Sequence, residues 1–278
     1  MVSTEYSTQQ LKEIASLLRQ DVIRMIYQAK SGHPAGSLGM ADVLTVLYFN
    51  ILSHNPELPD WSERDRVVLS NGHICPLLYA VLARSGYFPS EELNDLRKLG
   101  NKLQGHPSRK DFSLIETSSG SLGHGLSIAA GMSLSAKIDS KQSTIWCLMS
   151  DAEHQEGSTW EAAMFSANYE LSKLKVIVDR NEIQLSGDVD NIMSISPLKD
   201  KYTSFGWKVF EVDGHDFDDL TKTLIEAKNH QDGPCVVLAK TIPGKGVSFM
   251  EGKWQWHGKA PDNEETQKAL EELKIDEQ

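Results

Sequence analysis

The chain has 278 residues and a mass of 31.0 kDa, with 40% hydrophobic and 24% charged residues. These values fit a globular protein that is large enough for a full hydrophobic core. The formal net charge of −11 argues against a nucleic-acid surface, and no apolar run approaches the roughly 20 residues of a membrane span.

The amino-terminal segment and the cysteines favour a cytoplasmic protein. Residues 1–14 lack the basic region followed by an apolar region that marks a secretory signal. The cysteines are odd in number and show no metal-binding spacing. We therefore expect buried thiols in a reducing compartment at Cys75, Cys147 and Cys235.

Apolar residues recur at steps of three and four over residues 11–29, which predicts a first helix capped by Thr8. Gly32 and Pro34 should end this helix. Further helices are expected at residues 42–50, 76–85, 90–99, 126–136, 197–204 and 216–228, with an acidic helical tail at 263–278.

Short apolar runs between these helices indicate buried strands, in chain order at residues 66–69, 144–149, 176–178, 207–212 and 234–239. The alternation predicts the α/β class, with a doubly wound, mostly parallel sheet covered by helices on both faces. A glycine-rich loop is expected at 118–125, and a polar loop at 185–196 could close over a cofactor. No linker indicates a second domain, so residues 1–278 are interpreted as one domain with a helical N-terminal segment.

Two neighbouring predicted strands end in side chains with hard oxygen ligands, in Ser150-Asp151-Ala152 and in Asp179-Arg180-Asn181. Asp151 and Asn181 are about 30 residues apart, the length of one βαβ unit, so both should lie at the same edge of the sheet. One carboxylate and one amide oxygen suit Mg²⁺ or Ca²⁺, and Mg²⁺ usually takes phosphate oxygens as further ligands. The pattern therefore predicts a metal-bridged diphosphate. Either residue alone would be equally compatible with a helix cap or a turn.

Four of the nine histidines lie in glycine-rich or proline-containing loops, which favours an imidazole-lined funnel over ordinary solvated positions. These four are His33, His73, His106 and His257. Three others match no motif and are interpreted as ordinary residues, namely His54, His215 and His230. The sequence leaves the roles of His124 and His154 open.

Taken together, these motifs resemble those of the transketolases. The Asp151 and Asn181 pair resembles the thiamine diphosphate (ThDP) motif, in which Gly-Asp-Gly is followed about 30 residues later by Asn. Flanking stretches resemble transketolase signatures in the family's order: Ser31-Gly32-His33-Pro34, Leu69-Ser70-Asn71-Gly72-His73, Gly105-His106-Pro107, Gly120-Ser121-Leu122-Gly123, Gln155-Glu156-Gly157 and Trp256-His257-Gly258. The resemblance covers nearly the whole chain and implies the diphosphate-binding type of ThDP fold.

The resemblance also implies roles for individual residues. It makes Asp151, Asn181 and the backbone carbonyl of Ile183 the ligands of Mg²⁺, for which Ca²⁺ or Mn²⁺ can substitute. Residues expected to surround ThDP are His73, Gly120, Leu122, Gly123, Ser150, Ala152, Glu156, Ile242 and His257. The resemblance implies that His33, His106 and His257 bind the sugar hydroxyls and help to transfer protons. It also implies that Glu156 is linked through hydrogen bonds to a glutamate of a partner subunit.

The chain departs from the family's motif on both sides of Asp151. Ser150 and Ala152 stand where the family has glycines, which approach the diphosphate closely. If position 152 required a positive φ, alanine would cost about 1 kcal/mol there and weaken cofactor binding.

The implied reaction is reversible transfer of a two-carbon ketol unit from a ketose phosphate, such as xylulose 5-phosphate, to an aldose phosphate, such as ribose 5-phosphate. A full transketolase has three domains, and this chain resembles only the first. We therefore expect an inactive subunit that needs a second polypeptide with the pyrimidine-binding domain, in an α₂β₂ assembly. One alternative is a related ThDP enzyme for a sulfosugar, a branched sugar or the deoxyxylulose phosphate synthase reaction. Another is a degenerate, non-catalytic subunit, which only Ser150 and Ala152 support.

Overall fold

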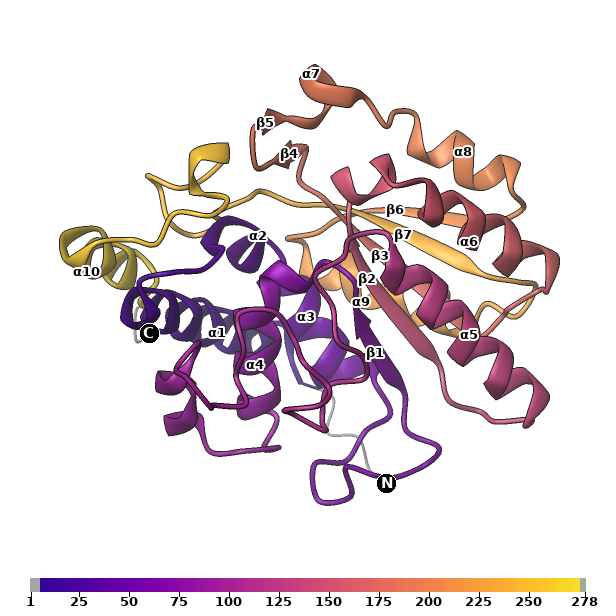
Figure 1. Ribbon diagram of the computed structural model, residues 1–278, viewed down its shortest axis with the longest axis horizontal. Coiled ribbons are helices and arrows are strands. Elements are labelled where there is room, and N and C mark those ends of the chain that lie inside the picture. Colours follow the sequence, from indigo (N-terminus) through magenta and orange to yellow (C-terminus); the bar gives the residue numbers. More distant parts are fainter. Residues whose placement is uncertain (1–5, 276–278) are drawn as a thin grey trace.

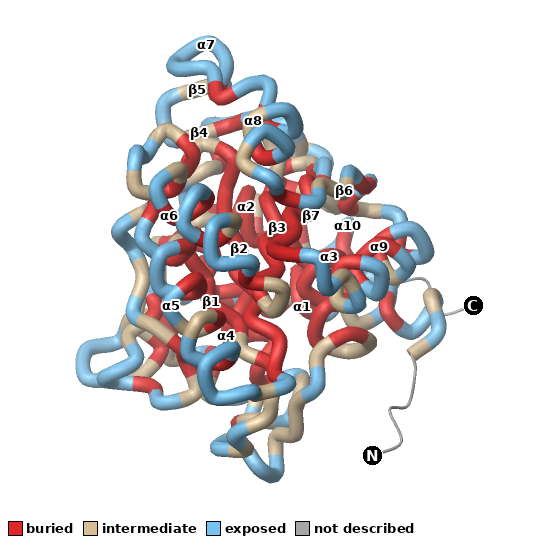
Figure 2. Tube along the Cα trace, turned by 90° about the vertical axis from the view of Figure 1, so that its right-hand side faces the viewer, coloured by how far each residue is buried: buried red, intermediate tan, exposed pale blue. Residues whose placement is uncertain are grey.

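The computed structural model describes residues 6–275, and its centre is a sheet of five parallel strands (Figure 1). In spatial order these are β1 (Arg66–Leu69), β2 (Ile145–Ser150), β3 (Leu174–Arg180), β7 (Cys235–Lys240) and β6 (Lys208–Asp213). All five predicted strands are present, within a few residues of the expected bounds. The interior strands β2, β3 and β7 are almost entirely buried, because helices cover the sheet on both faces (Figure 2).

Successive side chains of each strand enter two separate hydrophobic cores, one on each face of the sheet. Trp146 and Leu148 pack on the face covered by α1 (Thr8–Ala29), α3 (Ala41–Val46), α4 (Cys75–Arg84) and α9 (Phe217–Asn229). Cys147 and Met149 pack on the other face, against α5 (His124–Ile138), α6 (Gly157–Asn168) and α8 (Leu198–Ser204). The predicted doubly wound α/β architecture is confirmed.

The first helix begins one residue earlier than the sequence indicated. Ser7, not Thr8, is its cap, and Ser7 and Gln10 form a reciprocal capping box. The helix ends at Ala29, and Lys30 takes a left-handed conformation with φ of 50°. Pro34 does not only end a helix, since it also begins the short helix α2 (Pro34–Gly39).

Several expected elements differ in the structure. Residues 90–99 form only a 3₁₀ turn at Ser90–Asp95, and residues 42–50 divide between α3 and a π-helical turn at Leu47–Ile51. The expected loop at 185–196 contains part of a small hairpin, β4 (Ile183–Gln184) with β5 (Gly187–Asp188), and then α7 (Val189–Met193). The C-terminal helix α10 (Asn263–Glu272) ends before the predicted bound of 278, and residues 276–278 lie outside the described range.

Within residues 6–275, none of the helices combines the length and apolar character that crossing a membrane would require.

Candidate functional site

The two predicted oxygen ligands lie side by side at the carboxyl edge of the sheet. Ser150 at the end of β2 is in register with Asp179 of β3, so the residues that follow each strand meet. The Asp151 carboxylate accepts hydrogen bonds from the backbone N–H of Ala152 and of Glu182, each at 2.6 Å. The bond to Glu182 ties Asp151 to the residue next to Asn181. Asp151 also starts a 3₁₀ turn, so the capping and ligand interpretations are compatible.

Asp151 and Asp179 form a pair of buried carboxylates, each 1% exposed, and neither forms a salt bridge with a basic side chain of the described chain. Burial and the neighbouring Asp179 raise the pKa of Asp151 to about 7, and burial raises the pKa of Asp179 to about 6. Asp179 is held by hydrogen bonds from Asn181 Nδ2, at 2.8 Å, and from the Thr241 hydroxyl. A divalent cation bound beside these two carboxyl groups would compensate their charge and favour the ionised state of both.

The oxygen atoms of Asp151 and Asn181 suit a hard cation that is also coordinated by oxygens of a bound phosphorylated ligand. Asn181 Oδ1 accepts one hydrogen bond, from Ile183 N at 3.0 Å, and keeps a second lone pair. Among residues 6–275, no three His, Cys, Asp or Glu side chains converge as a metal site. The remaining coordination positions would therefore need backbone carbonyls, water and the oxygens of a phosphorylated ligand, as is usual for Mg²⁺.

The two departures from glycine next to Asp151 bring no backbone strain. Ser150 is the last residue of β2, and Ala152 opens the right-handed 3₁₀ turn Ala152–Gln155. Position 152 therefore does not require a positive φ, and the cost considered for alanine does not arise.

The four loop histidines gather at one place, although they come from segments far apart in the sequence. The ring of His33 lies 5.3 Å from that of His73, 6.1 Å from that of His106 and 5.5 Å from that of His257. The rings of His73 and His257 are 5.1 Å apart. A Cβ placed on Gly36 of α2 would lie 3.8 Å from His73 Nε2 and 3.9 Å from an Asp179 carboxylate oxygen. The imidazole cluster therefore adjoins the carboxylate pair.

All four imidazoles are held in the neutral state. Burial, followed by the nearby charges of His257, Arg97 and His106, lowers the pKa of His33 to about 4. Burial likewise lowers the pKa values of His73, His106 and His257. A neutral imidazole can accept a proton or a hydrogen bond, which an imidazolium cannot do.

Arg97 joins the two loops that carry His33 and His106. Its guanidinium donates to Ser31 Oγ at 2.7 Å and to the Gly105 carbonyl at 3.2 Å. The residue has φ of 61°, and a Cβ on Gly105 would lie only 2.8 Å from Arg97 Cζ. This packing explains why the helix expected at residues 90–99 does not form beyond the 3₁₀ turn that ends at Asp95.

The lowered pKa of His33 gives a pH-dependent stability. Between pH 6.5 and about 4 the unfolded chain binds more protons at this residue than the folded chain, so the free energy of unfolding falls as the pH is lowered. On unfolding near pH 5, the His33→Gln variant is expected to take up about one proton fewer than the wild type, so its stability should depend less on pH. Urea unfolding at pH 7 and pH 5 measures this, with His124→Gln at an exposed position as the control. Equal pH slopes for wild type and His33→Gln would contradict the expectation.

The glycine-rich loop lies over the histidine cluster. A Cβ on Gly120 would lie 3.4 Å from His106 Cδ2, and Gly123 has φ of 85°. His106 lines a recess of about 420 Å³ together with residues of the loop and of the start of α5, namely Thr117, Ser118, Ser119, Gly120, Ser121, His124, Gly125 and Ile128. Leu122 is half-buried in the same loop.

His154 and His215 have structural partners. The buried His154 donates from Nδ1 to the carbonyls of Ser150 and Asp151 and accepts at Nε2 from the Tyr202 hydroxyl, at 2.8 to 3.1 Å. His215 accepts from Ile242 N at 2.8 Å and contacts Asp42 at 2.7 Å. His154 therefore fixes the end of β2, and His215 fixes the half-buried Ile242 just beyond the end of β7.

Other polar groups at this edge were not singled out from the sequence. Asn71 follows β1, is fully buried, and both atoms of its amide lack a hydrogen-bond partner. His33 Nδ1, Ser119 Oγ and Gln184 Oε1 are also buried without a partner. Unpaired buried polar atoms are costly, so the five at this edge fit a site that receives a polar ligand. Three more lie elsewhere in the described chain, at Ser85, Ser133 and Trp146. Two sequence signals pointed to Asn71: it directly follows a predicted strand, and it lies in the transketolase-like stretch Leu69-Ser70-Asn71-Gly72-His73.

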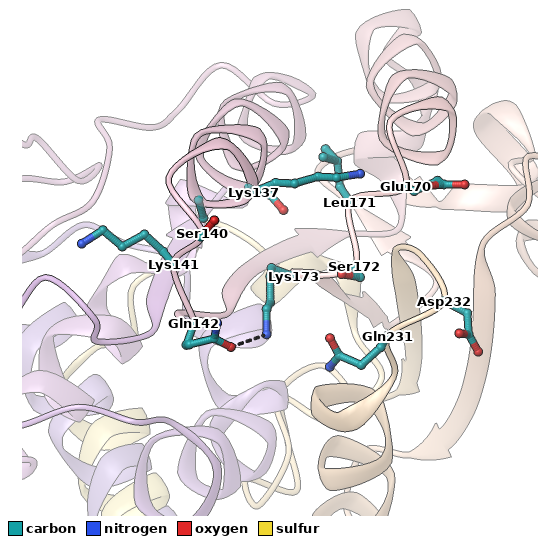
Figure 3. Close-up of a pocket in the computed structure, with 12 residues that line it drawn as sticks. Lys137, Ser140, Lys141, Gln142, Glu170, Leu171, Ser172, Lys173, Gln231 and Asp232 are labelled. Carbon is teal, nitrogen blue, oxygen red and sulfur yellow. Dashed lines mark hydrogen bonds between the residues drawn. The ribbon is translucent and has the colours of Figure 1, made fainter.

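A second hollow, of about 560 Å³, lies at the opposite edge of the sheet, before β2, β3 and β7 begin (Figure 3). Its lysines are engaged by neighbours: Lys137 donates to the Tyr169 carbonyl, Lys141 pairs with Glu63, and Lys173 contacts Gln142. Ser133 of α5 also lines this hollow, and its buried hydroxyl is the one lining side-chain group without a hydrogen-bond partner among the described residues.

Comparison with known proteins places this geometry in one family. Residues 10–278 match the model of the transketolase, thiamine diphosphate binding domain. A 6-deoxy-6-sulfo-D-fructose transketolase subunit of Clostridium sp. is 40% identical, with 95% of this chain and 96% of the relative covered. An apulose-4-phosphate transketolase subunit of Phocaeicola vulgatus is 38% identical, with 92% and 90% covered.

Full-length transketolases are similar over part of their length. Human transketolase is 36% identical over 95% of this chain, which spans 42% of that protein. The crystal structure of transketolase from Campylobacter jejuni superposes with a TM-score of 0.91 at 36% identity, with 96% of this chain and 43% of that chain covered. The chain therefore belongs to the transketolase family and carries its N-terminal, thiamine diphosphate-binding domain.

Proposed function

We propose that this chain is the diphosphate-binding subunit of a split transketolase that depends on ThDP and Mg²⁺. The observation that carries the proposal is the contact of Asp151 with the Asn181 turn, directly beside a cluster of four neutral histidines. The reaction is transfer of a two-carbon ketol unit from a ketose phosphate to an aldose phosphate.

The carboxylate of Asp151, the amide oxygen of Asn181 and the carbonyl of Ile183 would hold Mg²⁺ and, through it, the diphosphate. His73 and His257 would donate hydrogen bonds to the diphosphate. Ser150, Ala152, Gly120, Leu122, Gly123 and Ile242 would enclose the cofactor, which supplies the carbanion chemistry of ketol transfer when bound. His33, His106 and His257 would orient the sugar hydroxyls and accept protons from them, which their neutral state permits.

A partner subunit is proposed to cover helices α5 and α6. These helices expose apolar side chains at Ile128, Met164 and Phe165, and Tyr169 is exposed directly after α6. Glu156 is exposed at the start of α6, where it could reach a glutamate of the partner. Two similar relatives of about the same length are named as single subunits of a transketolase, which favours a second polypeptide with the pyrimidine-binding domain and an α₂β₂ assembly.

The sugar remains the open part of the proposal. Xylulose 5-phosphate and ribose 5-phosphate are the reference pair, but relatives are named for apulose 4-phosphate and for 6-deoxy-6-sulfo-D-fructose. These names favour the alternative in which the ketose is branched or sulfonated. A non-catalytic subunit is disfavoured because Ser150 and Ala152 fit without strain. The buried, unpaired cysteines support a reducing, cytoplasmic location.

The test is a turnover assay with ThDP and Mg²⁺. The purified chain alone is expected to give no turnover of xylulose 5-phosphate with ribose 5-phosphate, and activity should require the subunit with the pyrimidine-binding domain. The complex is then assayed with apulose 4-phosphate and 6-deoxy-6-sulfo-D-fructose to identify the donor. Robust turnover by the isolated chain would refute the split-subunit proposal. A two-subunit complex that binds no ThDP would refute the proposal that it is a ThDP-dependent enzyme.

A further inference from the structure

Glu153 is a fully buried acid that the roles proposed above do not use. Its side chain is 0% exposed. One carboxylate oxygen accepts hydrogen bonds from Gly123 N, at 2.7 Å, and from the Ser70 hydroxyl, and the other accepts from Ser150 N at 3.2 Å. Ser70 in turn accepts from Gly125 N at 3.1 Å. A single carboxylate therefore connects three segments that are far apart in the sequence.

Each of these segments carries residues of the candidate site. Ser70 directly follows β1 and precedes Asn71 and His73, Gly123 belongs to the glycine-rich loop, and Ser150 ends β2 beside Asp151. No other described side chain takes donors from all three segments. The relative position of the segments thus depends on Glu153.

The segment that follows Glu153 also holds Gly123 in place. Ser158 Oγ donates to the Gly123 carbonyl at 3.1 Å, and a Cβ on Gly123 would lie 2.6 Å from Glu156 Cβ. The N–H of Gly123 is therefore bonded to the turn between β2 and α6, and its carbonyl to the first turn of α6. With φ of 85°, this position suits glycine, whose lack of a side chain allows the close approach.

An ionised carboxylate is the one side chain that fits three converging donors, because it only accepts hydrogen bonds. A glutamine of the same shape would turn an N–H₂ group toward at least one of these donors. Burying a carboxylate without a basic partner is costly, and such a cost is common where a protein must fix a functional geometry.

We propose that Glu153 is a positioning residue for the cofactor, which holds the glycine-rich loop and the ends of β1 and β2 in the arrangement that encloses ThDP. This inference rests on the proposed function. Glu153 does not touch the cofactor itself; it acts through Ser70, Gly123 and Ser150.

The test compares Glu153→Gln with a matched control, Asp65→Asn. Asp65 is 4% exposed and accepts from two backbone amides, Ser53 N and Thr144 N, and from Lys228, but it lies at the amino end of the same strands. Both variants replace a buried, hydrogen-bonded carboxylate with its neutral amide, and Asp65→Asn also removes the ion pair with Lys228. ThDP affinity is measured by calorimetric titration of the complete two-subunit complex at saturating Mg²⁺, and backbone hydrogen exchange is measured on the full chain without cofactor.

Glu153→Gln is expected to weaken ThDP binding roughly 10- to 100-fold, the range found for residues that support a ligand shell. The amides of Gly123, Gly125 and Ser150 should exchange roughly tenfold faster. Asp65→Asn should leave ThDP affinity and these amides unchanged at a similar loss of Tm. If Glu153→Gln does not fold, Ser70→Ala removes one of the three donors and should show a smaller effect in the same direction.

ThDP affinity that is unchanged in Glu153→Gln, or lowered equally in Asp65→Asn, would overturn the positioning role. A wild-type complex that binds no ThDP would overturn the proposed function and the positioning role with it. The hydrogen-exchange result separates these cases, because it reports whether Glu153 fixes the loop without any cofactor present.

Discussion

Replacing Asp151 with alanine is expected to weaken Mg²⁺-dependent ThDP binding by more than about 100-fold, since loss of residues that only support a metal ligand already costs 10- to 100-fold. Asp151 is the only proposed metal ligand that carries a charge, so its loss removes most of the attraction for the cation. The backbone amides of Ala152 and Glu182 also lose their acceptor. Calorimetric titration of the two-subunit complex with ThDP, with and without Mg²⁺, measures the effect.

Two further variants separate the metal from the fold. Asp151→Asn keeps an oxygen toward one amide and removes the buried charge, so the metal-free chain should remain folded while ThDP binding is lost. Asp213→Ala is the matched control, because Asp213 ends β6 at the same edge and accepts from His215 N at 2.9 Å, outside the cluster. Equal ThDP affinity in Asp151→Ala and Asp213→Ala would show that Asp151 is not a metal ligand.

Met164→Glu is expected to abolish assembly with the partner subunit while the chain remains folded. Met164 is 50% exposed on α6, and burying a new carboxylate in an apolar interface leaves it without a partner. We expect the affinity for the partner to fall by more than about 100-fold, corresponding to at least about 2.8 kcal/mol at 1.4 kcal/mol per factor of ten. Size-exclusion chromatography with light scattering, together with the turnover assay, measures assembly.

The control for this surface is Ile225→Glu. Ile225 is 42% exposed on α9, which covers the opposite face of the sheet, so the same substitution is made at similar exposure. It should leave both assembly and turnover unchanged. Intact assembly in Met164→Glu, or equal loss in Ile225→Glu, would show that α5 and α6 are not the partner surface.

The main outline of the fold could be predicted because it depends on local patterns. Buried parallel strands are continuous apolar runs, so all five were located from the sequence, and the resemblance of several motifs identified the family. The expectation that Asp151 and Asn181 meet rests on one general property, that parallel strands separated by a helix present their carboxyl ends at the same edge. The structure places them there.

Elements whose shape depends on distant residues were predicted less well. Residues 90–99 have the composition of a helix, but Arg97 turns into a left-handed conformation to reach Ser31 and Gly105. The residues 185–196 look polar and irregular, yet they include β5 and α7. Local propensity competes with tertiary contacts in such segments, and the contacts decide the outcome.

Periodicity and motif spacing were sufficient to predict the chain order of the five main strands, the family and the candidate oxygen and imidazole groups. Three contacts became visible only in the folded chain: Glu153 accepts from Ser70, 83 residues away, His154 is held by Tyr202, and Asn71 is buried without a partner. Burial and hydrogen-bond satisfaction depend on which distant groups converge on a side chain, and spacing along one chain does not specify that convergence.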